Sequence, residues 1–343
     1  MLALGLVLPA CEAGGDPTSG GAAGGSESLS TAAPSVMAST SPGATRSAGT
    51  AEASGVAPRS SAGGVRVDPP CAPEPALALE EPSPPSDAAL LELLRSGSPI
   101  GSASIGTPAR GSLVGAVELS PIQPDGTELF ARSGKHPYAT ERVVRLLERA
   151  LREVHRCHPG GHRVHVGDLS RQNGGPLAPH RSHQSGLDAD VGFFYRPWEA
   201  WYVAPTADVL DGPRTWALLR ALLEGGHVEL VFLDRRVQTL LVPHACASPG
   251  ALDLARVFPL EGAPCSASPA SPRSGGAGLR WRSGAAQQEH LLRHEWGHHT
   301  HFHVRFTDPA AVERGARIER LDPKGLVRAQ GRAGRGKEKW GKP

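Results

Sequence analysis

The chain has 343 residues, a formal net charge of +2 at pH 7 and 5% aromatic residues. This nearly neutral composition has neither a broad basic face nor the mixture of basic and aromatic residues that is typical of nucleic-acid-binding proteins, so we expect no nucleic-acid partner. No apolar run reaches the roughly 18 residues that a transmembrane helix needs. The length permits one large domain or two smaller ones.

Residues 1–11 read MLALGLVLPAC. The segment LPAC resembles a bacterial lipobox, in which Cys11 would become the lipidated first residue of an exported protein and anchor it to a membrane. The apolar run is short and no Lys or Arg precedes it, whereas a complete signal peptide has a basic segment and a longer apolar one. We therefore expect a truncated or shifted start. An unstructured apolar N-terminus is the alternative.

Two segments have compositions that do not support a packed core. Residues 12–86 consist mainly of Gly, Ser, Ala, Thr and Pro, and they bury too little apolar surface to offset the entropy lost on ordering. We expect a flexible tether there, which lets a folded domain reach away from a membrane surface. Residues 315–343 are rich in Gly, Lys and Arg. We expect a disordered basic tail, with attraction to an anionic envelope surface as the alternative.

The regular elements are expected between residues 87 and 308, within a domain assigned to residues 87–314. Helical spacing of apolar residues is clearest in residues 140–157, where Thr140 fits an N-cap. The other helices that we expect cover residues 87–95, 213–226 and 237–245. Segments that are rich in apolar or alternating residues, as strands are, cover residues 104–119, 162–170, 187–195, 227–234 and 300–306. Residues 247–283 are expected to form a long loop.

Four cysteines follow Cys11, and none of them forms a C-x-x-C pair, so a thiolate zinc site is not expected. In an exported protein Cys246 and Cys265 can staple the loop between them, which leaves Cys71 with Cys157. Four cysteines allow three pairings, and the sequence does not choose among them. Free buried thiols are the alternative.

Residues 294–298, HEWGH, fit the zincin pattern H-E-x-x-H. In that pattern His294 and His298 lie one helical turn apart and Glu295 is the general base. Gly297 disfavours the required helix, and the residues that follow are strand formers. A zincin-type protease is therefore kept only as an alternative.

The next residues, THFHVRF, fit a strand instead. His301 and His303 then lie on one face, and Phe302 lies on the other, towards the core. A catalytic zinc ion usually has three protein ligands and one open position. The strand therefore needs partners from another segment.

The segment PHRSHQSGLDADVGFF supplies His183 and Asp190, which a glycine-containing turn separates. If the chain reverses across residues 184–187 and then enters a strand, both side chains point into one cleft. Asp188 shares a strand face with Asp190, so either carboxylate fits a ligand position. The apolar residues that follow Asp190 favour it as the ligand.

Together, SHQSGLDADVGFF and WGHHTHFHVRF resemble the H-x6-D and H-x-H motifs of the penicillin-insensitive murein endopeptidases, within the LAS group of zinc peptidases. Four further segments, IGSASIGTPARGSLVGAVEL, VHVGDLS, GGPLAPHRSH and ELVFLD, are also similar to that family, so the resemblance covers residues 99–308. It implies an α+β fold with a central antiparallel sheet, flanked by helices and long loops. It also implies Zn2+ bound by His183, Asp190 and His303, with His180 as a further metal ligand or an orienting residue.

The same resemblance implies two catalytic residues beside the metal. His301 would take the proton from the attacking water, and a protonated His298 would help to stabilise the oxyanion. The substrate would be peptidoglycan in the periplasm or cell envelope, cut at the cross-link between D-alanine and meso-diaminopimelate. Trp296 is expected to line the site, whereas packing is expected for Trp201. A non-catalytic metal-binding lipoprotein of the cell wall is the alternative.

Overall fold

The structure is a computed structural model, and it describes residue 71, residues 84–266 and residues 279–325. All of them belong to the unit formed by residues 66–343. The lipobox-like segment with Cys11, nearly all of the expected tether and the end of the expected tail lie outside the described residues. Among the described helices, none combines the length and the apolar character that crossing a bilayer requires.

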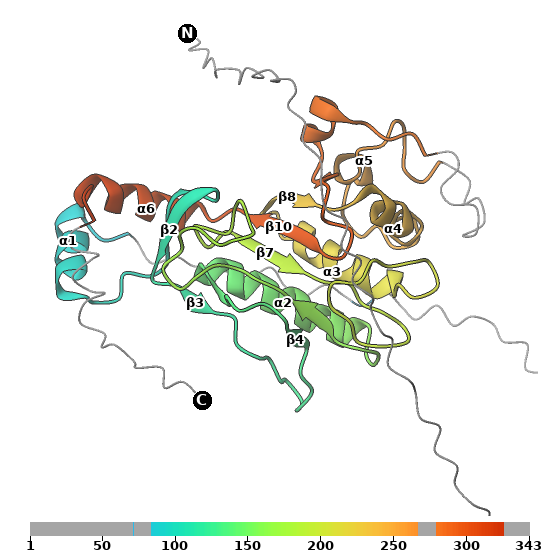
Figure 1. The fold of residues 1–343 in the computed structure, drawn as a ribbon, viewed down its shortest axis with the longest axis horizontal. Coiled ribbons are helices and arrows are strands. Elements are labelled where there is room, and N and C mark those ends of the chain that lie inside the picture. Colours follow the sequence, from blue (N-terminus) through green and yellow to red (C-terminus); the bar gives the residue numbers. More distant parts are fainter. Residues whose placement is uncertain (1–70, 72–83, 267–278, 326–343) are drawn as a thin grey trace, which may run out of the picture. The chain divides into compact units, whose positions relative to one another are not determined.

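A six-stranded sheet forms the centre of this unit, with the strand order β4-β6-β7-β10-β8-β9. Strands β4, β7, β10 and β8 are labelled in Figure 1. The strands are β4 (Phe130–Arg132), β6 (Val164–Val166), β7 (Asp188–Val191), β10 (Phe302–Phe306), β8 (Val228–Phe232) and β9 (Leu292–Arg293). The four inner strands pair antiparallel, whereas each edge strand pairs parallel with its neighbour. The expected α+β fold with a central antiparallel sheet is confirmed, and the parallel edge strands are an addition to it.

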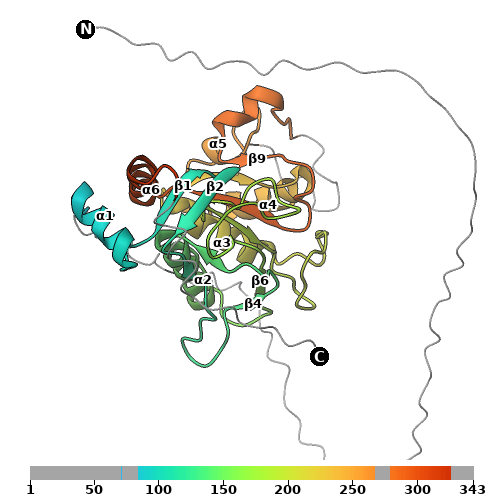
Figure 2. The ribbon, with the colours of Figure 1, turned by 60° about the vertical axis from the view of Figure 1, so that its left-hand side comes forward.

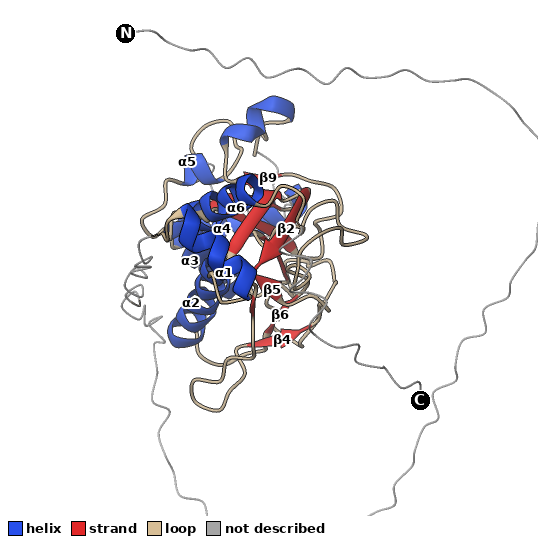
Figure 3. Ribbon diagram, turned by 90° about the vertical axis from the view of Figure 1, so that its left-hand side faces the viewer, coloured by secondary structure: helices blue, strands red, loops and turns tan. Residues whose placement is uncertain are grey.

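The two faces of the sheet differ in polarity because side chains alternate along a strand. Ala189 of β7 and Phe302 and Val304 of β10 belong to a core that is shared with the helices. The helices on this face are α2 (Glu141–Cys157), α3 (Gly212–Glu224) and α4 (Arg235–Ala247). Figure 3 shows helices gathered on one side of the strands and long loops on the other. Asp190 and His303 point away from the helices.

A second, smaller core joins the two ends of the described segment. Helix α1 (Asp87–Ser96) and the hairpin of β1 (Ala103–Thr107) and β2 (Arg110–Val114) pack with α6 (Pro309–Leu321), and α6 lies against β1 (Figure 2). Its buried residues are Leu90, Leu94, Ala103, Ile105 and Ile318.

Helix α6 extends past the expected domain end at residue 314. Gly315 allows this close packing, because a Cβ atom there would lie 1.9 Å from the carbonyl oxygen of Ser104. Ile318 is completely buried. The expected tail therefore begins inside a packed helix, and residues 315–321 belong to the domain.

Two disulfides close loops around this fold. Cys246 at the end of α4 is bonded to Cys265, and Cys71 is bonded to Cys157 at the end of α2. This is one of the three pairings that the cysteine count allows. Cys71 lies within the expected tether, so the chain is fixed to the domain before α1 begins.

The remaining elements are short and lie in connecting segments. They are β3 (Val117–Glu118), β5 (Tyr138–Ala139), α5 (Leu254–Val257) and a 3-10 helix at Gly284–Glu289. Helix α5 lies in the segment that was expected to be loop, and residues 267–278 of that segment are outside the described residues.

Candidate metal centre

The loop before β7 turns His183 back towards Asp190. His183 has a φ of 65°, in the left-handed region that is uncommon for residues other than glycine. Gly186, three residues later, has a φ of 78°, and a Cβ atom there would lie 2.8 Å from the side chain of Leu113. This turn places Nε2 of His183 3.3 Å from Oδ1 of Asp190. The predicted reversal of the chain between these two residues is present.

The pairing of β10 with β7 adds the third side chain. His303 lies opposite Asp190 in the antiparallel register. Its Nδ1 atom is 3.0 Å from Oδ1 of Asp190 and 3.1 Å from Nε2 of His183. Ligand atoms in a tetrahedral zinc site lie about 2.0–2.1 Å from the ion, and therefore about 3.3 Å from one another. The three atoms have the spacing of ligands that share one small cation.

Hydrogen bonds at the far side of each ring direct the lone pairs inward. Nδ1 of His183 lies 2.5 Å from the carbonyl oxygen of Leu169, and Nε2 of His303 lies 3.1 Å from Oδ1 of Asp188. Both partners can only accept, so these nitrogens donate, and the other nitrogen of each neutral ring carries a lone pair. Two lone pairs and a carboxylate oxygen thus converge, and a cation satisfies all three. The donor set fits a bound metal ion.

The pKa values of Asp190 and His303 both shift in the direction that favours the charged form. Burial alone would raise the pKa of Asp190, but contacts with His183 and His303 outweigh it and hold the pKa well below its ordinary value. Burial lowers the pKa of His303, yet Asp188 and Asp190 outweigh burial and raise it to about 9. The raised pKa favours the protonated ring of His303 in the metal-free protein, so a metal ion that takes the lone pair of Nδ1 competes with a proton.

His180 lies at the rim of this centre. Atoms of His180, His183 and Asp190 that can bind a metal all lie within 4.8 Å of one another. Nδ1 of His180 is 3.5 Å from Oδ2 of Asp190, and its Nε2 is 3.4 Å from Oδ2 of Asp168. His180 is half-buried, whereas His183 is completely buried. A metal-ligand role and an orienting role both fit this position.

Asp168 holds His180 in place, although no motif in the sequence pointed to it. Its Oδ1 atom accepts hydrogen bonds from the backbone N–H groups of Lys135 and His136, at 2.7 and 3.0 Å. Burial raises the pKa of Asp168, but His180 and these two N–H groups outweigh it and lower the pKa to about 2. The only sequence signal was a lone acidic residue near the end of the segment VHVGDLS.

His301 lies on the same side of the sheet as His303 and is also buried. Its Nε2 atom is 3.8 Å from Oδ1 of Asp190, and its Nδ1 atom is 3.1 Å from Oγ1 of Thr300. Burial is the main cause that lowers the pKa of His301, while Asp190 opposes this shift. A neutral imidazole with one nitrogen towards the ligands is able to accept a proton.

His298 completes the histidine cluster. Its ring centroid lies 5.2 Å from that of His301 and 5.9 Å from that of His303. Burial first, and then the neighbouring His301 and His303, lower its pKa to about 4. This lowered pKa favours the neutral ring at pH 7 over the protonated form that was expected. Its neutral ring can still donate one N–H group.

The HEWGH segment does not form the helix that a zincin requires. Residues 296–299 form turns, and Gly297 has a φ of 89°. Nδ1 of His294 accepts a hydrogen bond from the backbone N–H of Arg235 at 3.1 Å, away from the ligand atoms. The zincin alternative, with His294 and His298 on one helical face, is contradicted by this backbone.

Aromatic side chains border the centre on the side of His301. Trp201 lies against Gly167 and Gly192, where a Cβ atom would be 2.6 and 3.3 Å from its ring. Tyr202, with a φ of 64°, stacks on His301 with a centroid distance of 5.5 Å and is 61% exposed.

Trp201 packs against the fold, as expected for it, and its ring also lies near His301, with a centroid distance of 5.9 Å. The ring contact of Trp296, which was expected to line the site, is with His294 at 5.0 Å.

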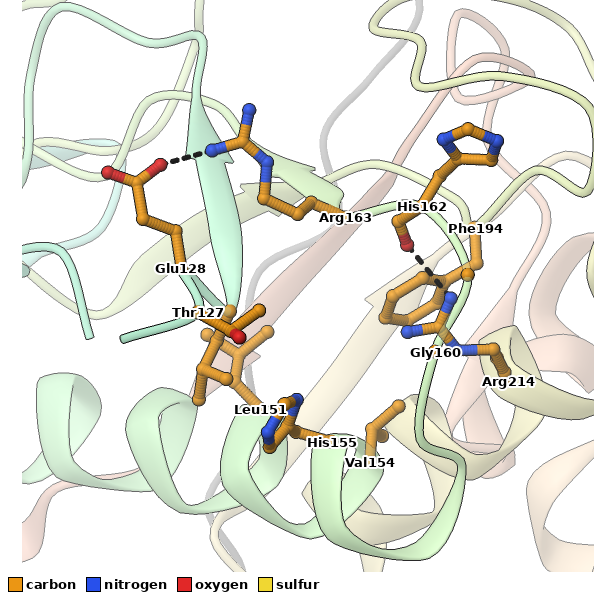
Figure 4. Close-up of a pocket in the computed structure, with 12 residues that line it drawn as sticks. Thr127, Glu128, Leu151, Val154, His155, Gly160, His162, Arg163, Phe194 and Arg214 are labelled. Atoms are coloured by element: carbon orange, nitrogen blue, oxygen red, sulfur yellow. Dashed lines mark hydrogen bonds and ion pairs between the residues drawn. The ribbon is translucent and has the colours of Figure 1, made fainter. Parts of the chain in front are cut away.

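A separate pocket lies at the far end of α2, and it contains none of these residues. Glu128, Leu151, Val154, His162, Arg163, Phe194 and Arg214 are among the residues that line it (Figure 4). Two arginine side chains there have partners within the fold. Arg163 pairs with Glu128, and Arg214 donates to the carbonyl oxygen of His162 at 2.8 Å and stacks on Phe194. The residues that can bind a metal lie instead on the face of the sheet that is opposite the helices.

Comparison with known proteins agrees with this site. Among curated proteins, none matches the chain. The model of the family Peptidase_M74, penicillin-insensitive murein endopeptidase, matches residues 104–205. The match includes His180, His183 and Asp190, and it supports a peptidase that acts on murein. It is shorter than the expected resemblance over residues 99–308, and β10 lies outside it. Over residues 104–205 the chain is thus similar to the penicillin-insensitive murein endopeptidases, and the resemblance inferred from its motifs is confirmed there.

Proposed function

We propose that the chain is a zinc-dependent endopeptidase that hydrolyses peptide cross-links in peptidoglycan. The observation that carries the proposal is the convergence of the ligand atoms of His183, Asp190 and His303 within 3.0–3.3 Å of one another. The family match over residues 104–205 supports the same activity.

His183, Asp190 and His303 would hold the zinc ion, and His180 would stand beside it. Two imidazoles and one carboxylate form a donor set that zinc accepts, and they leave room for a fourth ligand. When bound, zinc supplies a Lewis acid that polarises the scissile carbonyl and activates a water molecule. With one carboxylate ligand the centre keeps a net charge of +1, which favours this electrophilic role.

His301 would be the general base. Its Nδ1 atom faces the hydroxyl of Thr300, and its Nε2 atom faces the side of the ligands. Nε2 is therefore placed to take a proton from the attacking water and to return it to the leaving amine. The lowered pKa of His301 keeps this nitrogen free at neutral pH.

His298 would contribute a neutral N–H group. Its ring lies next to both His301 and His303, where it can donate to the oxygen that gains charge during attack. No serine nucleophile is needed for this reaction. Such an enzyme would not be acylated by β-lactams.

The substrate bond would be the cross-link between D-alanine and meso-diaminopimelate. Peptidoglycan as the substrate places the protein in the periplasm or elsewhere in the cell envelope. Anchoring through a lipid on Cys11 is part of the same proposal and rests on the LPAC segment alone.

The test is digestion of purified sacculi with the wild-type protein and with His303→Ala, followed by mass analysis of the muropeptides. We expect the wild type to convert cross-linked dimers into monomers with a new free amine, and His303→Ala to leave them intact. Addition of a zinc chelator should reproduce the effect of the variant, and zinc should restore the wild type.

Two control variants test whether the loss of activity is specific to this site. His299→Ala removes a nearby histidine that has no place in the proposed site, and Glu295→Gln removes the base of the rejected zincin arrangement. Both should retain wild-type activity. Intact dimers after incubation with zinc-loaded wild type would contradict the proposal.

A further inference from the structure

Asp188 is a completely buried carboxylate to which the proposed function gives no role. Its Oδ2 atom accepts a hydrogen bond from the backbone N–H of His183 at 2.8 Å. Its Oδ1 atom accepts from Nε2 of His303 at 3.1 Å and from Nε of Arg305 at 2.9 Å. One side chain thus contacts both histidines whose lone pairs face Asp190.

We propose that Asp188 is a positioning residue that fixes the tautomer of His303 and the backbone of His183, so that both present a lone pair to one metal ion. The proposal rests on the proposed metal centre and concerns how the fold prepares it. Asp188 itself would not contact the metal, because its oxygens are directed to the outer side of the His303 ring and to the main chain.

The tautomer of His303 follows from the chemistry of the contact. A carboxylate only accepts hydrogen bonds, so Nε2 of His303 must carry a hydrogen. In the neutral ring Nδ1 then has none, and Nδ1 is the atom 3.0–3.1 Å from Asp190 and His183. A partner that donates to Nε2 would favour the opposite tautomer, with a hydrogen on Nδ1 that points at the metal position.

The backbone contact acts on the second ligand. His183 adopts a left-handed conformation with a φ of 65°, which is disfavoured for a residue with a Cβ atom. Its N–H donates to an ionised oxygen, and charge-assisted hydrogen bonds of this kind are stronger than neutral ones. The contact therefore stabilises the turn that brings the imidazole of His183 over Asp190.

Strand pairing explains why one carboxylate reaches both ligands. Asp188 lies opposite Arg305 in the register of β7 with β10, two positions from the pair of Asp190 and His303. Side chains two apart on a strand share a face, so Asp188 lies beside the metal position without occupying it. Arg305 pairs with Asp188 and keeps the carboxylate in place.

The decisive variant is Asp188→Asn, studied in the full chain. The amide cannot satisfy all three donors, because one of its two positions carries N–H groups. If the amide nitrogen faces His183, two donors meet, because the backbone N–H of His183 also donates. Directed at His303, the amide nitrogen favours the wrong tautomer. We expect zinc affinity, measured by competition with a chromophoric chelator, to fall by about 10- to 100-fold, the range seen when outer partners of metal ligands are lost.

The matched control is Asp308→Asn. Asp308 is also buried, but its partners are the backbone N–H of Ala311 at the start of α6 and the side chain of Arg142, neither of which belongs to the proposed metal centre. It should lose stability and keep wild-type zinc affinity. Circular dichroism and thermal unfolding of both metal-free variants check that each is folded.

A second measurement does not depend on any variant folding. Nitrogen-15 NMR of the histidine rings in the zinc-loaded wild type should find a hydrogen on Nε2 of His303 and none on Nδ1. A hydrogen on Nδ1 of His303, or wild-type zinc affinity in folded Asp188→Asn, would overturn the role of Asp188. Failure of the wild type itself to bind zinc would instead refute the proposed metal centre.

Discussion

The two faces of strand β10 differ in role: one packs into the core, and the other carries a proposed metal ligand. Phe302, Val304 and Phe306 pack into the core that the helices cover, while His303 lies among the metal-binding side chains on the opposite face. The same alternation serves stability on one side and chemistry on the other. A shift of the register by one residue would exchange the two sets. The packed face therefore determines where the ligands lie, and substitutions on the two faces should have separable effects.

The largest effect is expected for His301→Ala, which should lower activity without lowering zinc affinity. General acid–base catalysis contributes about 10²- to 10⁴-fold to a rate, and kcat on sacculi or a soluble muropeptide dimer should fall by about that amount. His301 is not a proposed ligand, so zinc affinity should remain at the wild-type level. Equal loss of zinc affinity and activity would mean that His301 binds the metal instead.

Its neighbour Phe302 provides the opposite case. Phe302 is completely buried, and its ring lies 6.1 Å from that of Phe193. Phe302→Ala should lower the free energy of unfolding by about 3–5 kcal/mol, as measured by urea denaturation. The molecules that remain folded should still bind zinc. Unchanged stability would show that this face is not the packed one.

A substitution of Tyr202, at the border of the site, should change stability and activity by smaller amounts. Its left-handed backbone is disfavoured for tyrosine but not for glycine. Tyr202→Gly should therefore raise the free energy of unfolding by about 1 kcal/mol, and it should lower kcat/KM because the exposed ring beside His301 is lost. Trp296→Ala, which removes another exposed aromatic ring, is the control and should change neither quantity appreciably.

The smallest effect concerns pH and the helix-covered side. Burial is the main cause that lowers the pKa of His244 below its ordinary value of 6.5, with Arg196 adding to it and Asp211 opposing it. At this position the unfolded chain therefore binds more protons than the folded one as pH falls below about 7, and the contribution of His244 to stability falls in that range. Between pH 7.5 and 5.5 the metal-free wild type should lose more stability than His244→Gln. An identical pH dependence would exclude this contribution.

Local patterns in the sequence were sufficient for the strongest elements. The spacing of Val143, Leu147 and Val154 predicted α2, and the alternation in HFHVRF predicted β10. The H-x6-D and H-x-H motifs predicted that His183, Asp190 and His303 would meet. The two elements were predictable because they depend on periodicity, and the turn between His183 and Asp190 is short. The approach of His303, 113 residues from Asp190, was instead implied by the resemblance to a family.

Features that depend on long-range pairing were not predictable in this way. The contact of Asp168 with His180 follows from how distant segments pack, and a lone acidic residue carries no signal of that. The sequence placed Asp188 on the face of Asp190, but its contacts with His183 and His303 depend on the turn and on strand pairing. Residues 315–321 were assigned to a polar tail because residues 315–343 are rich in Gly, Lys and Arg. The close contact of Gly315 with Ser104 depends on the packing of α6 against β1. The parallel edge strands are likewise a property of the assembled sheet.

The Cys71–Cys157 bridge has a consequence for how the protein withstands proteolysis. A single cut at any peptide bond between these two cysteines opens the enclosed loop but leaves both fragments covalently joined. The fragment that begins at residue 1 would thus remain attached to the catalytic domain until the bridge is reduced. If a lipid holds Cys11 at a membrane, one nick in this stretch would not release the enzyme.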